Sequence, residues 1–473
     1  RKISTLLMLF CAFVCTAWAA PTDFPVMSEG ENIKWYTLSN TRSTSGKYLY
    51  WTEGGVKDSN ERTAASFFYF TGTAEECYIH NYSTELLFSG DGAWTDAGVA
   101  CKLSVSPSET GFMIGFNGTF LNERNYDNGF TIWGDINDAG SIFVAEEITD
   151  FSAVIDVPAA KEAAIAELTN LATVSTIYPA ATTAIAAVNA VPADDKSLAG
   201  LNAAVEAVNK IVADYKAAAY QALSGKYFTI NTLGRAQYGY MKASGSSVVG
   251  TETAVSPANI WQFEYNDGAV SVFNPYTGLY LGTPGGNSSN VPLTADKAKY
   301  DLVVFANASN ADAKIKLTCD GKSVHMAGNG TLVRWDNGGA SEWAVIEVAD
   351  FSAIIDAYKT ATISTLDQWA TLSVVFDAAL IASSKESVNA VNTNSFETFA
   401  AIDAKLKDVT DKVAQKYFTF RNSDTNNSAR TDAYLAANSS TGKGCGTKSF
   451  DYSAIWRLKS AGGTSFYLYN ELN

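Results

Sequence analysis

The hexapeptide KYFTIN (226–231) opens the stretch on which the chain is built, residues 226–348. Three segments of about 40 residues follow one another there, each with a strand-like start, a glycine-containing turn and an apolar closing strand. The closing strands read IWQFE (260–264), LVVF (302–305) and EWAVIE (342–347). Short strands separated by Asn, Asp and Gly turns are typical of an all-β barrel or sandwich. The threefold repetition favours a closed threefold barrel.

The same unit recurs along the chain, which is the strongest signal in the sequence. Related opening strands read KWYTLSN (34–40) and KYFTFRN (416–422), and DFSAVID (150–156) recurs as DFSAIID (350–356). The repeats predict β domains at 32–149, 225–349 and 416–473. The third is much shorter than the second, so we expect the sequence to stop inside a domain of a longer protein.

Residues 150–224 and 350–415 are rich in alanine and have helical periodicity. Each is predicted to form a small three-helix bundle that separates two β domains. The apolar positions expected on one helical face are Leu201, Val205, Val208, Val212 and Tyr215 in the first, and Phe399, Ile402, Leu406, Val409 and Val413 in the second. The predicted fold class is mainly β with helical segments.

The N-terminus has the features of a secretory signal peptide at 1–19, with Arg1-Lys2, a short apolar run and a small-x-small site ending at Ala19. We therefore expect a secreted or cell-surface protein without a membrane span. Cys77 and Cys101 are 24 positions apart in one β domain, and an exported protein could join them by a disulfide worth about 3 kcal/mol. A net charge of −15 makes nucleic acid an unfavourable partner.

Motifs of catalysis are absent. The two histidines, His80 and His325, lie in different β domains without a zinc-binding spacing, and no cofactor or metal is expected. Asp135 begins a partial match to a calcium loop, but its flanks read as strands, which favours a turn. A carboxylate pair for glycoside hydrolysis stays open, because its members need only meet in space.

Aromatic residues beside polar ones are the better candidates, since a sugar stacks its C–H face on a ring and pairs its hydroxyls with polar groups. The predicted binding residues are Trp335, Asp336 and Asn337, with Trp133 and Asp135 at the matching place in the first domain, and a second group of Asn274, Tyr276 and Tyr280. The alternatives are that Trp335 fills the core and that the second group forms a packed hairpin turn. Trp261, Trp343 and Trp456 are expected in the cores.

With its threefold segments, closing tryptophans and Trp335-Asp336 before the last strand, the second domain resembles the β-trefoils of the ricin-type lectin superfamily. The resemblance covers residues 225–349 well, the first domain more loosely and the third in part. The family's Gln-x-Trp signature is missing, since the closing strands read NIW (259–261) and SEW (341–343). The resemblance implies tandem β-trefoils and recognition of galactose-type or related glycans by Asp and aromatic residues in shallow pockets.

Three hypotheses follow. The first is a secreted, non-catalytic carbohydrate-binding protein with glycans or a polysaccharide as partner. The second is the N-terminal accessory region of a larger secreted glycosidase or peptidase. The third is a surface structural or adhesive protein that binds protein partners. The sequence leaves the sugar and the oligomeric state open.

Overall fold

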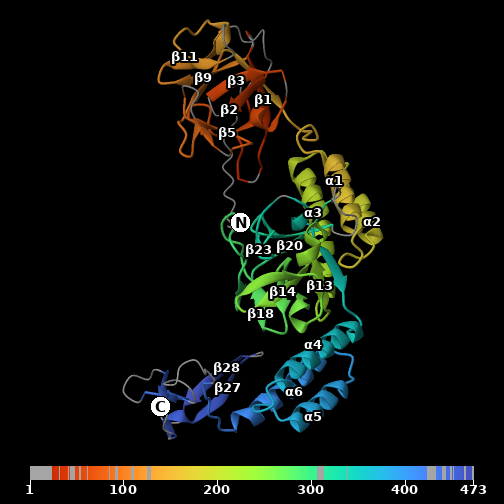
Figure 1. Cartoon of the computed structure of the whole chain (residues 1–473). Helices are drawn as coiled ribbons and strands as arrows, with labels where there is room; N and C mark the ends of the chain where they lie inside the picture. Colours follow the sequence, from red (N-terminus) through yellow and green to blue (C-terminus); the bar gives the residue numbers. More distant parts are fainter. Residues whose placement is uncertain are drawn as a thin grey trace, which may run out of the picture. The chain divides into compact units, whose positions relative to one another are not determined.

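The computed structural model describes most of residues 24–470 (Figure 1). The residues outside the described part are 1–23, 31, 41, 43–47, 53–54, 61, 85, 91–93, 108–110, 125–128, 306–313, 337, 423–432, 439–443, 448–449, 451, 463–464 and 471–473. The predicted signal peptide at 1–19 therefore lies outside the described residues. The chain divides into two compact units, one within residues 1–165 and 185–211, the other within 166–184 and 212–473.

Among the described residues β-strands outnumber α-helices, and the α-helices occur in two stretches, as expected for the predicted class, mainly β with helical segments. None of the helices in this part has both the length and the apolar character needed to cross a bilayer.

In the first unit six strands pair antiparallel in a closed ring, here called barrel 1. In ring order they are β1 (Tyr36–Asn40), β4 (Phe68–Gly72), β5 (Cys77–Asn81), β8 (Lys102–Val105), β9 (Phe112–Phe116) and β12 (Phe143–Glu147). The last strand returns to the first, with Tyr36 opposite Glu147. Three further strand pairs connect ring strands: β2 (Tyr48–Thr52) with β3 (Gly55–Ser59), β6 (Leu87–Phe88) with β7 (Trp94–Thr95), and β10 (Thr119–Glu123) with β11 (Phe130–Trp133).

The second unit contains a matching ring, barrel 2. Its ring strands are β13 (Phe228–Asn231), β16 (Gln262–Asn266), β17 (Ala269–Asn274), β20 (Asp301–Val304), β21 (Ile315–Cys319) and β24 (Ala344–Glu347). Its connecting pairs are β14 (Tyr240–Ser244) with β15 (Ser247–Thr251), β18 (Leu279–Leu281) with β19 (Leu293–Thr294), and β22 (Lys322–Met326) with β23 (Leu332–Arg334). Single bridges join these three pairs to one another, Ser247 with Pro292, Val249 with Thr331, and Asn290 with Val333.

Three single bridges complete the ring of barrel 2, Phe228 with Trp261, Val270 with Tyr300, and Ile315 with Trp343. The second residue of each bridge is fully buried and donates a side-chain hydrogen bond into a neighbouring strand pair. These bonds run from Trp261 Nε1 to Met241 O (3.2 Å), from Tyr300 Oη to Gly282 O (2.7 Å) and from Trp343 Nε1 to Val324 O (3.1 Å). The prediction that Trp261 and Trp343 pack in the core is confirmed.

An asparagine at the end of a strand fixes the short 3₁₀ turn that precedes the strand paired with it. Its amide nitrogen donates to two turn carbonyls: Asn40 to Gly140 and Ile142, Asn81 to Ala65 and Phe67, Asn274 to Ala258 and Ile260, and Asn470 to Ser453 and Ile455. Buried carbonyls without a partner are costly, so this clamp stabilises each turn.

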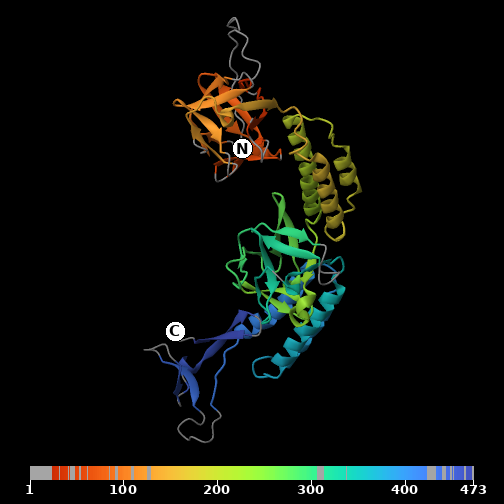
Figure 2. The ribbon, with the colours of Figure 1, turned by 90° about the horizontal axis from the view of Figure 1, so that it is seen from above.

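The helices lie where the sequence predicted helical segments. They are α1 (Val157–Leu171), α2 (Thr182–Ala190) and α3 (Leu198–Ala222), then α4 (Ser352–Ala370), α5 (Ala378–Asn389) and α6 (Glu397–Ala414). Helices α4, α5 and α6 pack on one another (Figure 2). Of the apolar face predicted for α6, Phe399, Ile402, Val409 and Val413 are fully buried.

The last stretch repeats the start of a barrel. It has β25 (Tyr434–Ala437), β26 (Gly444–Thr447), β27 (Trp456–Gly462) and β28 (Ser465–Asn470), with β27 and β28 forming a hairpin (Figure 2). Phe418 bridges to Trp456, and Trp456 Nε1 donates to Leu435 O at 2.8 Å, as Trp261 does to Met241. Trp456 is buried, as predicted.

Candidate functional site

Trp335 follows β23 and is 41% exposed, so the alternative that it fills the core of barrel 2 is wrong. Its backbone is fixed at both ends: the nitrogen donates to Ser323 O (3.1 Å), and the carbonyl accepts from Ser341 Oγ (2.9 Å). The structure therefore presents an indole ring at the surface on a backbone held by the neighbouring turn.

Asp336 is held beside the ring. Its Oδ1 accepts from the Ser323 nitrogen (2.9 Å), and its Oδ2 lies 3.3 Å from Arg334 Nη2. The carboxylate is still partly exposed, so it has lone pairs for a further donor. Asn337, the third predicted member of this group, lies outside the described residues.

His325 was not among the predicted residues, and its ring centroid lies 6.4 Å from that of Trp335. Its Nδ1 is 2.9 Å from Ser341 Oγ. The Ser341 hydroxyl donates its hydrogen bond to Trp335 O, so towards His325 it can only accept. We therefore assign the His325 proton to Nδ1, which leaves Nε2 as an acceptor. Burial, and then the charge of Arg235, lower the pKa of His325, so the ring is neutral at pH 7.

Arg235 is far from Trp335 in the sequence. It lies just after the first strand of barrel 2, in the short helical turn η3 (Leu233–Tyr238). Thr232 Oγ1 donates to Gly339 O (3.0 Å), which fixes this turn against the one that holds Ser341. The buried Nε of Arg235 has no hydrogen-bond partner among the described residues. We call the five residues Trp335, Asp336, His325, Ser341 and Arg235 the Trp335 surface.

The Trp335 surface offers an aromatic face, a carboxylate, a neutral imidazole acceptor and guanidinium donors. Rings pack on apolar C–H faces, while the polar groups can pair with hydroxyls. The arrangement can hold a hydroxyl-bearing ring. No group of three or more His, Cys, Asp or Glu side chains suited to a metal occurs among the described residues.

The corresponding residues of barrel 1 are arranged differently. Trp133 ends β11 and is 53% exposed, and no aromatic ring packs on it within the described part of the chain. Asp135 accepts from the backbone nitrogen of Asn137 (2.9 Å) and so caps its own turn. Both are on the surface, but without neighbours like those of the Trp335 surface.

The second predicted group does not form one site. Asn274 is fully buried, and its amide carries the clamp described above, so it is structural. Tyr276 Oη donates to Asp403 in α6 (3.1 Å), which ties barrel 2 to a helix. Tyr280 Oη donates to Glu264 (3.0 Å), and its pKa is raised by burial and then by this bond. The packed-turn alternative therefore describes Asn274 better than a binding role does.

Cys77 and Cys101 are antiparallel bridge partners on neighbouring strands of barrel 1. Each backbone nitrogen donates to the other's carbonyl at 2.8 Å, and the two thiol sulfurs are 2.9 Å apart in a buried setting. The hydrogen bond between the two thiols and burial raise the pKa of the Cys101 thiol. The disulfide stays a prediction, and the pairing places the two residues at a separation that a disulfide can span.

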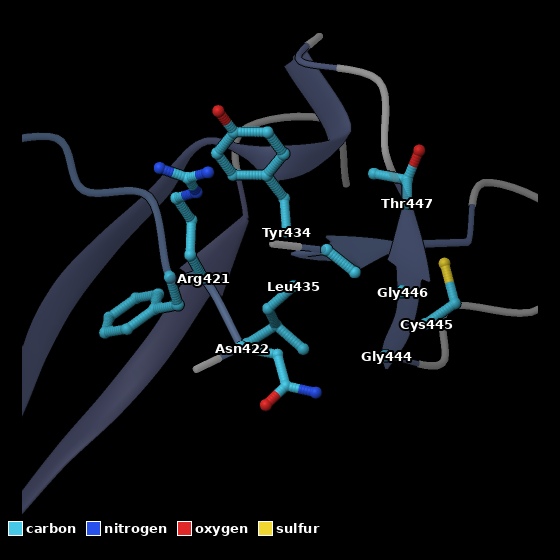
Figure 3. Close-up of a pocket in the computed structure, with 10 residues that line it drawn as sticks. Arg421, Asn422, Tyr434, Leu435, Gly444, Cys445, Gly446 and Thr447 are labelled. Carbon is cyan, nitrogen blue, oxygen red and sulfur yellow. The ribbon is translucent and has the colours of Figure 1, made fainter. Parts of the chain in front are cut away.

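A cavity of about 720 Å³ lies between residues 420–422 and the β25–β26 hairpin (Figure 3). The Arg421 guanidinium lies 5.5 Å from the centre of the Tyr434 ring (Figure 3). Cys445 and Thr447 lie on β26, with Gly446 between them. None of the residues predicted to bind carbohydrate lines it.

No protein-family model and no curated protein matches the chain. Among solved structures, a Macrolepiota procera ricin B-like lectin in complex with lactose is 17% identical, covers 26% of this chain and 96% of its own, and has a TM-score of 0.23. The Rhizoctonia solani agglutinin is 16% identical, with 26% and 94% coverage and a TM-score of 0.22. A mosquitocidal holotoxin is 8% identical and covers 92% of this chain, which spans 41% of the holotoxin, at a TM-score of 0.23. TM-scores this low establish no relationship.

Proposed function

We propose that this chain is a secreted, non-catalytic carbohydrate-binding protein. In this proposal β-trefoils occupy residues 32–149 and 225–349, a third begins at residue 416, and the helices between them are spacers. The closed rings of barrels 1 and 2, each with three connecting strand pairs, support the trefoil assignment. Recurrence of the bridge and asparagine clamp at Trp456 and Asn470 supports the third domain.

The observation that carries the binding proposal is the exposure of Trp335 beside fixed polar groups. A pyranose ring would stack on the indole. One of its hydroxyls would donate a hydrogen bond to Asp336, and another would donate to His325 Nε2. Arg235 would donate to a ring substituent. Such a shallow surface binds weakly, but several copies on one polymer could raise avidity by roughly 10² or more.

A glycan array tests the proposal, with the whole chain from residue 20 onward applied as wild type, Trp335→Ala and Trp133→Ala. The whole chain is required, because the core of barrel 2 includes Tyr178 and Tyr220 from the helical segment. We expect wild-type binding that Trp335→Ala weakens most. No binding at high glycan density, or equal binding by all three proteins, would refute it.

Binding to a protein partner is the second candidate, favoured by exposed apolar residues of the last hairpin. Tyr467, Leu468 and Tyr469 are each about half exposed or more. Tyr467 and Tyr469 lie on one face of β28 and Leu468 on the other, so the two tyrosines offer an aromatic contact to a partner. If the array is negative and charged substitutions of these residues abolish adhesion to cells or matrix, this candidate replaces the first. Hydrolysis of a recognised polymer would instead favour the accessory-region hypothesis.

A further inference from the structure

A second cavity lies against barrel 2, away from the residues of the Trp335 surface. It has a volume of about 550 Å³ and is bounded by β13, β24 and residues 173–176 of the loop after α1. Cavities of several hundred cubic ångströms suit small ligands. The helical segment therefore supplies one wall of a cavity, a role that the sequence did not predict for it.

This wall is held in place by hydrogen bonds to the barrel. Asn170 Nδ2 donates to Val304 O (3.0 Å), and Tyr178 Oη donates to Leu302 O (2.8 Å). Tyr220 Oη accepts from the Leu302 nitrogen (3.2 Å). Anchors on both sides of residues 173–176 give the cavity a defined shape before any ligand enters, which lowers the entropy cost of binding.

Asn231 is the unusual residue of the cavity lining. It is 5% exposed, and its Oδ1 has no hydrogen-bond partner among the described residues. Asn40 ends the equivalent strand of barrel 1 and clamps its turn fully. In barrel 2 Thr232 Oγ1 bonds the turn instead, at Gly339 O, and no clamp bond from Asn231 occurs among the described residues. Buried polar atoms nearly always have a hydrogen-bond partner, so we expect a water or ligand group to pair with the Asn231 side chain.

The rest of the lining indicates which partner fits. The loop contributes the hydroxyls of Thr173, Ser175 and Thr176, and Tyr240 is half-buried at the barrel side. Leu233 and Ile346 add apolar walls. Lys314 adds an ammonium group. Hydroxyl groups, an amide, an aromatic ring and an ammonium donor match a molecule that carries several hydroxyls on a small apolar frame.

We propose that this cavity is a separate ligand site for a small, hydroxyl-rich molecule such as a sugar. The ligand's hydroxyls pair with the Asn231 side chain and with the loop hydroxyls. Water fills the polar cavity when the ligand is absent. The proposal is independent of the Trp335 surface, so either site can fail without the other.

Ligand-observed saturation-transfer NMR on the whole chain tests this proposal, with glucose, galactose, N-acetylglucosamine and myo-inositol as probes. Asn231→Leu removes the amide at similar volume, and Ser175→Trp fills the cavity from an exposed loop position. We expect transfer to at least one probe in the wild type and in Trp335→Ala, and a loss of at least about tenfold in affinity in both cavity variants.

Thermal unfolding supplies the control for folding. Asn231→Leu breaks no side-chain hydrogen bond seen among the described residues, so its melting temperature without ligand should equal or exceed that of the wild type. Asn274→Leu, which breaks a clamp, should lower it. The proposal is overturned if no probe receives transfer, if both cavity variants bind as wild type does, or if Trp335→Ala abolishes the signal.

Discussion

Barrels 1 and 2 close with the same strand pairing but secure it with different residues. At the bridge positions where barrel 2 has Trp261, Tyr300 and Trp343, barrel 1 has Phe68, Cys101 and Phe143. The barrel 2 residues each donate a hydrogen bond to a connecting strand pair, whereas a phenylalanine has no donor.

The comparison shows that a ring topology tolerates buried bridge side chains of different size and polarity. It also explains why the surfaces differ. In barrel 2 the bond from Trp343 to Val324 fixes β22, the strand that carries Ser323 and His325. In barrel 1 the ring of Phe143 is buried without such a bond, and Trp133 is more exposed than Trp335.

The largest expected effect is from removing a bridge side chain of barrel 2. Trp343→Ala should lower the free energy of unfolding by about 4 kcal/mol, because it leaves a large cavity and an unpaired carbonyl. Trp343→Phe copies barrel 1 and should cost only about 1 kcal/mol through the lost bond. Urea denaturation measures both. Equal losses in the two variants would contradict a separate role for the hydrogen bond.

The next effect concerns the cysteine pair of barrel 1. If the disulfide forms in the secreted protein, Cys77→Ser should destabilise barrel 1 by about 3 kcal/mol under oxidising conditions. Reductant should lower the wild-type melting temperature and leave the variant unchanged. Mass spectrometry of a digest without reductant shows whether the cross-linked peptide exists. An unchanged wild-type melting temperature in reductant would refute the disulfide.

A smaller effect is expected at the asparagine clamps, which both barrels share. Asn274→Ala should cost about 2 kcal/mol, because two turn carbonyls lose their donor. Asn40→Ala should cost a similar amount in barrel 1. Urea denaturation of the two variants compares the barrels directly. A cost in one barrel alone would show that the clamp is not a common element.

The smallest effect is the pH dependence of the histidines. Burial lowers the pKa of His80, and burial and Arg235 lower that of His325. A lowered pKa in the folded state gives stability that is complete above the unfolded value of about 6.5 and is lost as pH falls below it. The melting temperature should therefore drop slightly from pH 7.5 to 5.5. His325→Gln should reduce that drop, and a drop unchanged in His325→Gln and His80→Gln would exclude the histidines as its cause.

The ring strands could be predicted because each barrel packs them with apolar residues at repeated spacing. The apolar residues of closing strands such as IWQFE (260–264) predict that these strands are buried. The asparagine clamps were missed, although a signal existed: Asn81 and Asn274 each follow their second clamped carbonyl by 14 residues. Asn274 was instead taken for a surface residue, because polar residues near turns are usually exposed.

The Trp335 surface could be predicted only in part. Trp335 and Asp336 are adjacent and beside a turn, so the sequence indicates them. Arg235 and His325 reach the same place through closure of the ring, in which the first strand pairs with the last. Contacts of this kind join residues far apart in the chain and leave no local pattern. The same holds for the cavity wall at residues 173–176.

The most direct test of the account is the affinity of the whole chain for the best glycan on the array, measured by calorimetry for wild type, Trp335→Ala and Trp133→Ala. The account predicts that Trp335→Ala lowers affinity at least about tenfold and Trp133→Ala lowers it less, because fixed polar neighbours are seen beside Trp335 in the described part of the chain. An unchanged affinity in Trp335→Ala, in a protein that unfolds at the wild-type temperature, would contradict it.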